Sequence, residues 1–391
     1  MSYRKLKADF LFDGFNMHQN AVLICRQDGT IEAIVDENLA GGDLENYPGL
    51  LTPGFINSHC HLELSHLKNR TPEKQGLVPF VLSVINQRDQ DPLFIQEAAR
   101  IAEQDMLSAG IVAVGDICNT IDTGNIKSAK RLAYYNFIEL LGWIPGLAES
   151  RYSAAKSLEA RFIKMGQDEK YMSLNPHAPY SVSSGLWNLM EPDFRDKTIT
   201  IHNQETTEEN EFFISGTGEL THMYAGMKID NSHFKPPGTR SLPYYLSRLK
   251  SAARQVLVHN TYMDESDLKE ALDFSKNLFF CFCPNANIFI ENRLPAIPLF
   301  IKYRDRLLLG TDSLASNRHL SILEEMKTIK KNFPSIPTTE MLLWGTSNGA
   351  KALSFDDRLG EFTKGKKPGI VLLENLNEGE INILTTARRI I

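Results

Sequence analysis

Histidine and acidic residues that could bind a metal ion recur at the ends of short apolar segments. In chain order these residues are His59, His61, His202, Glu205, His259 and Asp312. Residues two apart on a strand point to the same face, so His59 and His61 can reach one ion. Imidazoles with a carboxylate suit zinc or iron, and a catalytic site keeps one position open for water. The joint pattern predicts a catalytic metal site.

Each of the acidic candidates also has a structural interpretation. Glu205 could be a carboxylate at a helix N-terminus, and Asp312 could be a helix N-cap. Glu63 lies two residues beyond His61. If the strand continued, its side chain would point to the same side as those of His59 and His61, but it could equally be a solvated carboxylate in a loop. His177 is either a substrate contact or a hydrogen-bonded structural histidine. We take Glu63 and His177 as candidate substrate-binding residues.

The elements that must position these residues are short β-branched segments alternating with helical ones. Eight strands are predicted, over Leu50–His61, Gly110–Cys118, Leu132–Gly142, Tyr171–Pro179, Lys197–Glu205, Gln255–Met263, Asn277–Asn287 and Leu307–Ser313. Eight such units are typical of the (β/α)8 TIM barrel, whose chemistry lies at the carboxyl ends of its strands. Five of the ten histidines, including His177, lie at those predicted ends. The fold class is therefore α/β.

The two ends of the chain do not fit the barrel count. Residues 1–54 indicate strands with turns at Asp13-Gly14 and Asp28-Gly29, and residues 354–391 contain two further strand-like segments, 368–373 and 381–386. We expect a small β-sandwich-like domain formed from both termini, with the barrel over 55–353. Residues 210–240 lack periodicity and carry several glycines and prolines, which favours a lid over the site.

Composition excludes several classes of protein. The 391 residues are 42% hydrophobic and carry a net charge of −6 without a dense basic run, which argues against a nucleic-acid polymer as partner. No apolar run approaches the length of a membrane span. The N-terminus lacks a signal-peptide pattern, so a cytoplasmic protein is expected. The five cysteines are scattered and predict buried thiols.

Several motifs together resemble the metal-dependent amidohydrolase superfamily, in its branch of chlorohydrolases and nucleobase or nucleoside deaminases. The matching segments are Pro53-Gly54-Phe55-Ile56-Asn57-Ser58-His59-Cys60-His61, His202-x-x-Glu205, Val256-Leu257-Val258-His259-Asn260, Cys283-Pro284-Asn285-Ala286-Asn287 and Gly310-Thr311-Asp312-Ser313. The resemblance covers nearly the whole chain.

This resemblance assigns roles residue by residue. His59, His61, His202 and Asp312 match the metal ligands of the family. Glu205 matches the proton-shuttling glutamate, and His259 the histidine that contacts the attacking water, while Asp312 also orients that water. Strand 171–179 has none of the carboxylates or lysines that bridge two metals in relatives, so one divalent ion is expected, with zinc favoured over iron. Glu139 leaves a second metal open.

The resemblance implies hydrolytic deamination of an amino-substituted heterocycle, such as a nucleobase or nucleoside. The segment His59-Cys60-His61-Leu62-Glu63-Leu64-Ser65 is similar to the H-x-H-L-E region of aminofutalosine deaminases. Adenosine-type, guanine and triazine substrates stay open, because the fold and metal site do not fix the substrate. The alternatives are hydrolysis of a cyclic amide or N-acyl bond and a non-catalytic interaction protein. A homodimer is one option for the assembly.

Overall fold

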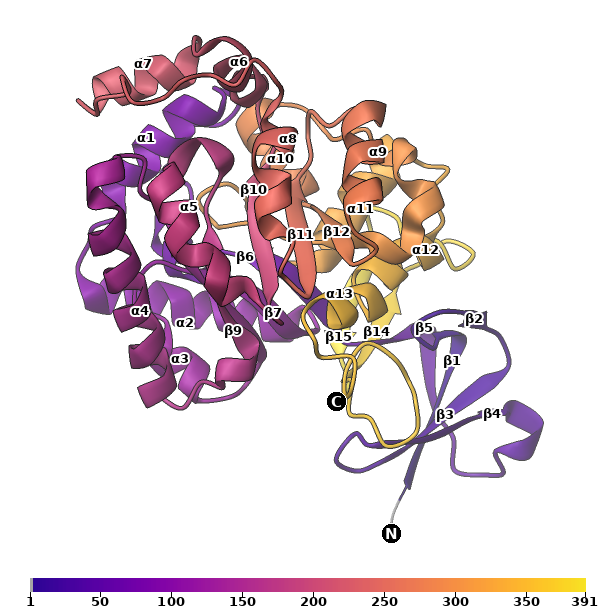
Figure 1. Ribbon diagram of the computed structural model, residues 1–391. Coiled ribbons are helices and arrows are strands. Elements are labelled where there is room, and N and C mark those ends of the chain that lie inside the picture. Colours follow the sequence, from indigo (N-terminus) through magenta and orange to yellow (C-terminus); the bar gives the residue numbers. More distant parts are fainter. Residues whose placement is uncertain (1–2) are drawn as a thin grey trace.

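The computed structural model describes residues 3–391 and contains all eight strands predicted for the central part of the chain (Figure 1). These strands are almost wholly buried, as expected for parallel strands covered by helices on their outer face. They are β6 (Phe55–Cys60), β7 (Ile111–Cys118), β8 (Ala133–Leu140), β9 (Met172–Pro176), β10 (Thr198–Asn203), β11 (Arg254–His259), β12 (Leu278–Phe282) and β13 (Leu307–Leu309).

The eight strands form two parallel sheets of four strands each. Their orders are β6-β7-β8-β9 and β10-β11-β12-β13, so neighbours in space are neighbours in sequence. The sheets approach each other at both edges. The His202 amide donates to the His177 carbonyl at 2.9 Å, and the Thr311 amide donates to the His59 carbonyl at 3.0 Å. Within the described residues the strand ladder is therefore nearly continuous but not closed.

All eight predicted segments are longer than the strands in the structure, and two of them differ most. The segment Leu50–His61 is divided at Gly54, because β5 (Glu45–Pro53) pairs with the terminal strands and only β6 enters the central sheets. A Cβ at residue 54 would lie 2.3 Å from Val112 and 2.7 Å from the Pro368 carbonyl oxygen, so this close junction requires glycine. The segment predicted to end at Asn287 ends at Phe282, because Pro284 begins a helix.

Strands from both termini form one further sheet of seven strands. Its order is β15-β14-β5-β1-β3-β4, with β2 paired to β1, and both chain ends lie on the side of the molecule away from α6 and α7 (Figure 1). The strands are β1 (Tyr3–Phe12), β2 (Met17–His18), β3 (Ala21–Arg26), β4 (Ile31–Asp36), β5, β14 (Ile370–Glu374) and β15 (Thr386–Arg389). The hydrogen bonds define a single sheet and not the two sheets of a sandwich, and β15 begins at the last residue of the predicted segment 381–386.

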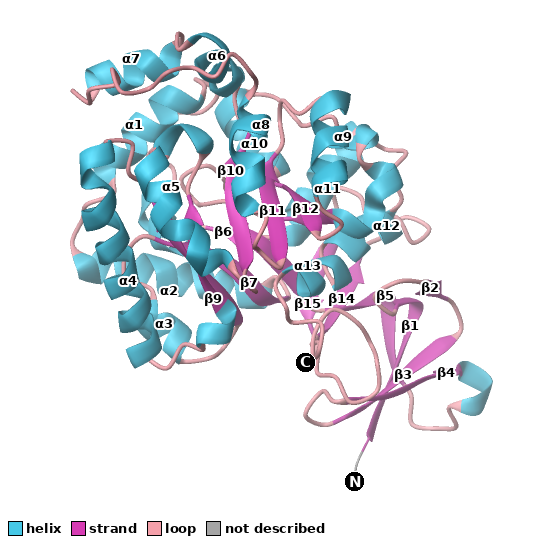
Figure 2. Cartoon of the chain, in the orientation of Figure 1, coloured by secondary structure: helices cyan, strands magenta, loops and turns pink. Residues whose placement is uncertain are grey.

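Helices surround the central strands (Figure 2). In α2, the buried residues Ile95, Ala99, Ala102 and Met106 form one apolar stripe, and Asp91 caps the helix by accepting from two amides. The α-helices are α1 (Leu77–Gln87), α2 (Pro92–Ser108), α3 (Gly124–Ser128), α4 (Ala148–Lys164), α5 (Ser184–Met190), α6 (Thr207–Ser215), α7 (Glu219–Gly226), α8 (Ser241–Tyr245), α9 (Glu265–Phe274), α10 (Pro284–Glu291), α11 (Ile322–Asn332), α12 (Thr338–Trp344) and α13 (Ser347–Ala352).

The stretch 210–240 is more regular than a lid loop. It contains the end of α6 and all of α7, which lie together at one end of the molecule (Figure 1). Phe212 stacks on Phe234 with ring centroids 4.5 Å apart, and Trp143 stacks on Tyr224 at 5.5 Å. These rings belong to an apolar cluster that also includes Phe80 of α1, so the segment is packed onto the rest of the chain.

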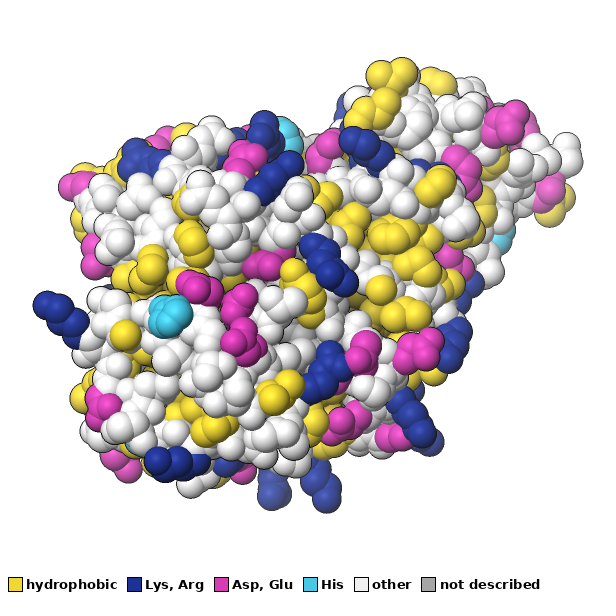
Figure 3. Space-filling model, turned by 90° about the horizontal axis from the view of Figure 1, so that it is seen from above, with side chains coloured by type: hydrophobic (Ala, Val, Ile, Leu, Met, Phe, Trp, Pro, Cys, Tyr) yellow, Lys and Arg dark blue, Asp and Glu magenta, His cyan; other side chains and the backbone are white. Residues whose placement is uncertain are grey.

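The distribution of surface charge and the burial of the cysteines agree with what the composition predicted. On the face shown in Figure 3, lysine and arginine side chains are interspersed with acidic ones and form no continuous band. Among the described residues, no helix is long and apolar enough to cross a membrane. All five cysteines are free and buried, which confirms the prediction of buried thiols.

Candidate metal centre

Three imidazoles converge at the carboxyl ends of β6 and β10. The Nε2 atom of His61 lies 3.2 Å from Nε2 of His59 and 3.3 Å from Nε2 of His202. All three side chains are buried, and their ligand atoms lie within 4.8 Å of one another. A strand end supplies this arrangement because His59 and His61 are two residues apart and project to the same side.

Asp312 adds a carboxylate to this cluster from the segment after β13. Its Oδ1 lies 3.3 Å from Nε2 of His61 and 3.6 Å from Nε2 of His59, while Oδ2 accepts a hydrogen bond from Ser316. Burial alone would raise the pKa of Asp312, but the imidazoles of His59, His61 and His259 beside it hold that pKa well below its ordinary value. Asp312 is therefore an anion that faces the imidazoles, and it caps no helix in the described chain.

The protonation of these groups fits a metal ion. Burial lowers the pKa of His202 to about 3 and that of His61 well below its ordinary value, so both are neutral at pH 7, as ligands must be. Nδ1 of His202 lies 2.6 Å from the His177 carbonyl oxygen and must donate to it, which leaves the Nε2 lone pair directed at the cluster. Three nitrogens and one carboxylate oxygen suit zinc or iron.

Glu205 and His259 lie side by side next to this cluster. Oε1 of Glu205 is 3.6 Å from Nε2 of His259, and both side chains are buried. Burial and the nearby carboxylate of Asp312 raise the pKa of Glu205 well above its ordinary value. A carboxyl group with a raised pKa can both give and take a proton near neutral pH.

The orientation of His259 is set by its backbone and by Asn287. The φ angle of His259 is 72°, and Asp312 has a φ of 55°; both are left-handed conformations, which are uncommon for non-glycine residues. The Asn287 amide lies 3.3 Å from Nδ1 of His259. Donation by that amide places the ring proton on Nε2, facing Glu205. Sequence reasoning did not give Asn287 this role, although it belongs to the 283–287 motif.

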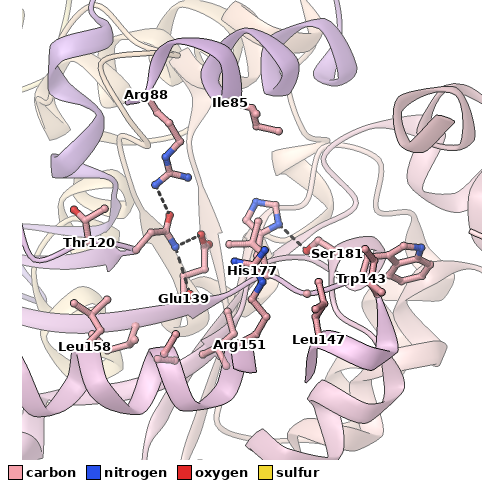
Figure 4. A pocket seen from close by; sticks show the side chains of 18 of the residues that line it. Ile85, Arg88, Thr120, Glu139, Trp143, Leu147, Arg151, Leu158, His177 and Ser181 are labelled. Atoms are coloured by element: carbon pink, nitrogen blue, oxygen red, sulfur yellow. Dashed lines mark hydrogen bonds between the residues drawn. The ribbon is translucent and has the colours of Figure 1, made fainter. Parts of the chain in front are cut away.

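His177 and Glu139 lie on the far side of His202. Nδ1 of His177 is 2.8 Å from the Ser181 hydroxyl, and burial lowers the pKa of His177 to about 4 (Figure 4). Glu139 accepts from the Asn119 amide at 3.0 Å and lies 3.7 Å from Nδ1 of His202. His177, Glu139 and His202 form a second group of potential metal ligands. However, Nε2 of His202 faces the first cluster and its Nδ1 is hydrogen-bonded, so His202 cannot serve both.

Glu63 does not point into the cavity beside the imidazoles. Its Oε1 accepts from Arg88 at 3.2 Å, and its Oε2 accepts from the backbone amides of Asn119 at 3.0 Å and Thr120 at 2.9 Å. Glu63 is 3% exposed, and burial raises its pKa to about 7. Both carboxylate oxygens are occupied, because the chain turns into a short 3-10 helix (Leu62–Leu67) directly after His61. In this structure Glu63 positions the loop after β7.

A fully buried ion pair supports the backbone next to the imidazole cluster. Nζ of Lys127 lies 2.5 Å from Oδ2 of Asp116, and Oδ1 of Asp116 accepts from the Leu62 amide at 2.8 Å. Burial alone would lower the pKa of Lys127, but Asp116 and Cys118 raise it above its ordinary value. The pair therefore fixes the residue that follows His61. The sequence does not predict this ion pair, because lysine side chains are seldom buried.

Replacing Lys127 by methionine should destabilise the protein by about 3–5 kcal/mol, because it leaves the buried Asp116 carboxylate without its counter-charge. The free energy of unfolding in urea would measure this loss. Lys164→Met removes a charge from the exposed end of α4 and is the matched control. A loss below about 1 kcal/mol at Lys127 would show that the pair is not a stabilising element.

Parallel α/β strands with imidazoles and carboxylates gathered at their carboxyl ends define the class of metal-dependent hydrolases. The chain belongs to the amidohydrolase family, which matches residues 50–390.

Comparison with individual proteins gives three informative similarities. The chain is 28% identical to an adenosine deaminase of Helicobacter pylori over 328 residues, covering 81% of this chain and 77% of that protein. It is 27% identical to an aminodeoxyfutalosine deaminase of a Nitratiruptor species over 386 residues, covering 91% and 88%. A crystal structure of Helicobacter pylori aminofutalosine deaminase with methylthio-coformycin has a TM-score of 0.78 at 22% identity, covering 96% and 93%. This last similarity concerns the fold.

Proposed function

We propose that this protein is a hydrolase that removes the exocyclic amino group of an adenine-like heterocycle and releases ammonia. The observation that carries this proposal is the convergence of three imidazoles and Asp312, with the Glu205–His259 pair beside them. Family membership and the deaminase names of the similar proteins support the same reaction.

For the fold, we propose that the two four-stranded sheets are the halves of one (β/α)8 barrel. The hydrogen bonds between their edges, at His177–His202 and His59–Thr311, support this proposal. We further propose that residues 55–353 form the barrel domain and that residues 1–54 and 354–391 form the small β domain. The seven-stranded sheet, which draws strands from both termini, supports these limits.

For the metal, we propose one divalent ion, held by His59, His61, His202 and Asp312. The donor set favours zinc and also suits iron. A single ion is supported because His202, which the second ligand group also needs, is already committed on both ring nitrogens. When bound, such an ion supplies Lewis-acid chemistry and lowers the pKa of a water molecule toward neutrality.

The residues around the proposed ion have separate roles in the reaction. In the proposed reaction, water adds to the ring carbon that bears the amino group, and the bond from that carbon to the amino nitrogen then breaks. Glu205 takes one proton of the water and passes it to a ring nitrogen. It then takes the remaining proton of the added hydroxyl, which becomes a carbonyl oxygen, and gives it to the departing amine, which leaves as ammonia. Nε2 of His259 donates a hydrogen bond to the oxygen being added. His177 contacts the substrate from the opposite side.

For the substrate, we propose an adenine nucleoside, with aminofutalosine among the candidates. Two similar proteins are named as deaminases of an adenosine and of an aminodeoxyfutalosine. An inner cavity of about 120 Å³ lies beside Glu205 and His259. Both observations support a heterocyclic substrate that binds next to the proposed metal ion. The protein would act on a small molecule, without a nucleic-acid polymer or a membrane as partner. We also propose a cytoplasmic location and a homodimer, which cell fractionation and analytical ultracentrifugation would test.

Ammonia release provides the direct test. Protein loaded with zinc or with iron should release ammonia from at least one of adenosine, 5′-deoxyadenosine and aminofutalosine, and not from cyclic amides such as hydantoin. The matched control is the same protein after metal chelation, which should be inactive. Ring opening of the cyclic amide without ammonia release from any nucleoside would replace deamination by the amide-hydrolase alternative.

A further inference from the structure

A fully buried carboxyl group outside the imidazole cluster, that of Glu325, lies on the inner face of α11. It shares this face with the buried apolar residues Ile322, Met326 and Ile329, which are three or four positions away along the helix. A polar group in such surroundings is unfavourable unless it is hydrogen-bonded. Burial raises the pKa of Glu325 to about 8, even though hydrogen bonds to the group act in the opposite direction. The partners of Glu325 therefore have to explain why the fold keeps a carboxyl group here.

Three N–H groups donate to Glu325. Its Oε2 accepts from the Asn285 backbone amide at 2.9 Å, and its Oε1 accepts from the side-chain amides of Asn285 at 3.0 Å and Asn317 at 2.7 Å. Each of these side-chain amides is oriented by a further donor. The Thr328 hydroxyl donates to Oδ1 of Asn285, and the Arg318 backbone amide donates to Oδ1 of Asn317. Both NH2 groups therefore face Glu325, which accepts on both of its oxygens.

One arm of this network leads to His259. Asn285 lies in the first turn of α10, two residues before Asn287. The side-chain amide of Asn287 donates to the Thr261 hydroxyl at 2.7 Å and lies 3.3 Å from Nδ1 of His259. Because Glu325 binds both the backbone and the side chain of Asn285, it fixes the start of α10. It thereby fixes the amide that faces His259.

The other arm leads to Asp312. The side-chain amide of Asn317 donates its second hydrogen to the Thr311 carbonyl oxygen at 2.9 Å, directly before Asp312. The hydroxyl of Ser316, the residue before Asn317, donates to Oδ2 of Asp312. Glu325 therefore holds the loop after β13 at the point where that loop returns to its own carboxylate.

His259 and Asp312, at the ends of the two arms, both have left-handed backbones. Such a conformation in a non-glycine residue persists where the surrounding structure holds it. We propose that Glu325 is a positioning residue of the candidate site, which sets the placement of His259 relative to Asp312 through Asn285 and Asn317. Glu325 acts through these residues and is not itself a catalytic group. This inference rests on the proposed deaminase function and adds to it a residue that no motif of the site contains.

Glu325→Gln tests this role, because it preserves the size of the side chain but places an NH2 group opposite N–H donors. With adenosine, 5′-deoxyadenosine and aminofutalosine as substrates, kcat per bound metal should fall by about 10- to 100-fold, as expected when reacting groups are displaced by up to about 1 Å. KM should stay within about threefold of the wild-type value, because the residues that line the inner cavity are unchanged. The matched control is Glu324→Gln, which removes the adjacent, partly exposed carboxylate that pairs with Lys327. It should change neither constant.

The visible absorption spectrum of cobalt-substituted protein gives a measurement that needs no turnover. The bands of bound Co²⁺ depend on the geometry of its ligands, and Asp312 is one of the proposed ligands. Glu325→Gln should shift these bands, and Glu324→Gln should leave them as in the wild type. A variant Glu325→Gln with lower stability but with the wild-type spectrum and the wild-type kcat per bound metal would overturn the proposal, since Glu325 would then be a structural residue only.

Failure of the proposed function would look different. If the wild type releases ammonia from none of the three nucleosides, deamination is overturned, and the cobalt spectra alone decide whether Glu325 positions Asp312. If Glu325→Gln does not fold, Thr328→Val replaces it, because this change removes only the hydroxyl that orients the Asn285 amide. It should lower kcat by about three- to tenfold at unchanged KM, as expected for loss of one hydrogen bond. An unchanged kcat in Thr328→Val would then contradict the proposal.

Discussion

Glu205→Gln should lower kcat for ammonia release by about 10²–10⁴-fold while leaving the metal content unchanged. Glutamine preserves the size and hydrogen-bonding capacity of the side chain but cannot carry a proton between water, ring and amine. Glu205 lies 3.6 Å from His259, and burial raises its pKa, as expected of a group that must both take and release a proton. Steady-state ammonia release and elemental analysis of the same preparation would measure the two effects.

The matched control for this experiment is Glu211→Gln, which removes an exposed carboxylate from the same segment, on α6. It should leave kcat unchanged. Full activity of Glu205→Gln at normal metal content would remove Glu205 from the proton-transfer role. The helix-terminus interpretation would then be preferred, since Glu205 lies just before α6.

His59→Ala should abolish metal binding and, with it, all measurable deamination. His59 is fully buried, and its Nε2 lies 3.2 Å from Nε2 of His61 and 3.6 Å from Asp312. Alanine removes one of the four proposed ligands and leaves a space that no neighbouring donor fills. Metal per chain, measured by elemental analysis after gel filtration, should fall from about one to near zero.

His222→Ala is the control for loss of a histidine, because His222 lies exposed on α7, away from the cluster. Its metal content should match that of the wild type. Circular dichroism of His59→Ala should still show a folded α/β protein, because the surrounding strands keep their apolar contacts. Metal content of about one per chain in a folded His59→Ala variant would contradict the ligand assignment.

Local sequence patterns predicted the elements well where they depend on nearby residues. The eight central strands were recognisable because short segments rich in apolar and β-branched residues alternate with helical segments. Asp264 shows the same local dependence at a helix start, because its side chain accepts from two backbone amides and caps α9. The predicted strand limits were wrong where a strand pairs with a segment distant in sequence. Leu50–Pro53, before Gly54, pairs with β14 as part of β5 and does not belong to the central strand.

The sequence by itself determined which residues gather in the imidazole cluster, because the ends of parallel strands meet at one edge. His59, His61, His202, His259 and Asp312 all lie in the last residues of a strand or just after one. Only the tertiary structure decided what surrounds them. It turned Glu63 away from the cavity toward Arg88 and buried Lys127 against Asp116. The physical reason is that strand position follows from local burial patterns, whereas the direction and partner of a charged side chain depend on packing between distant segments.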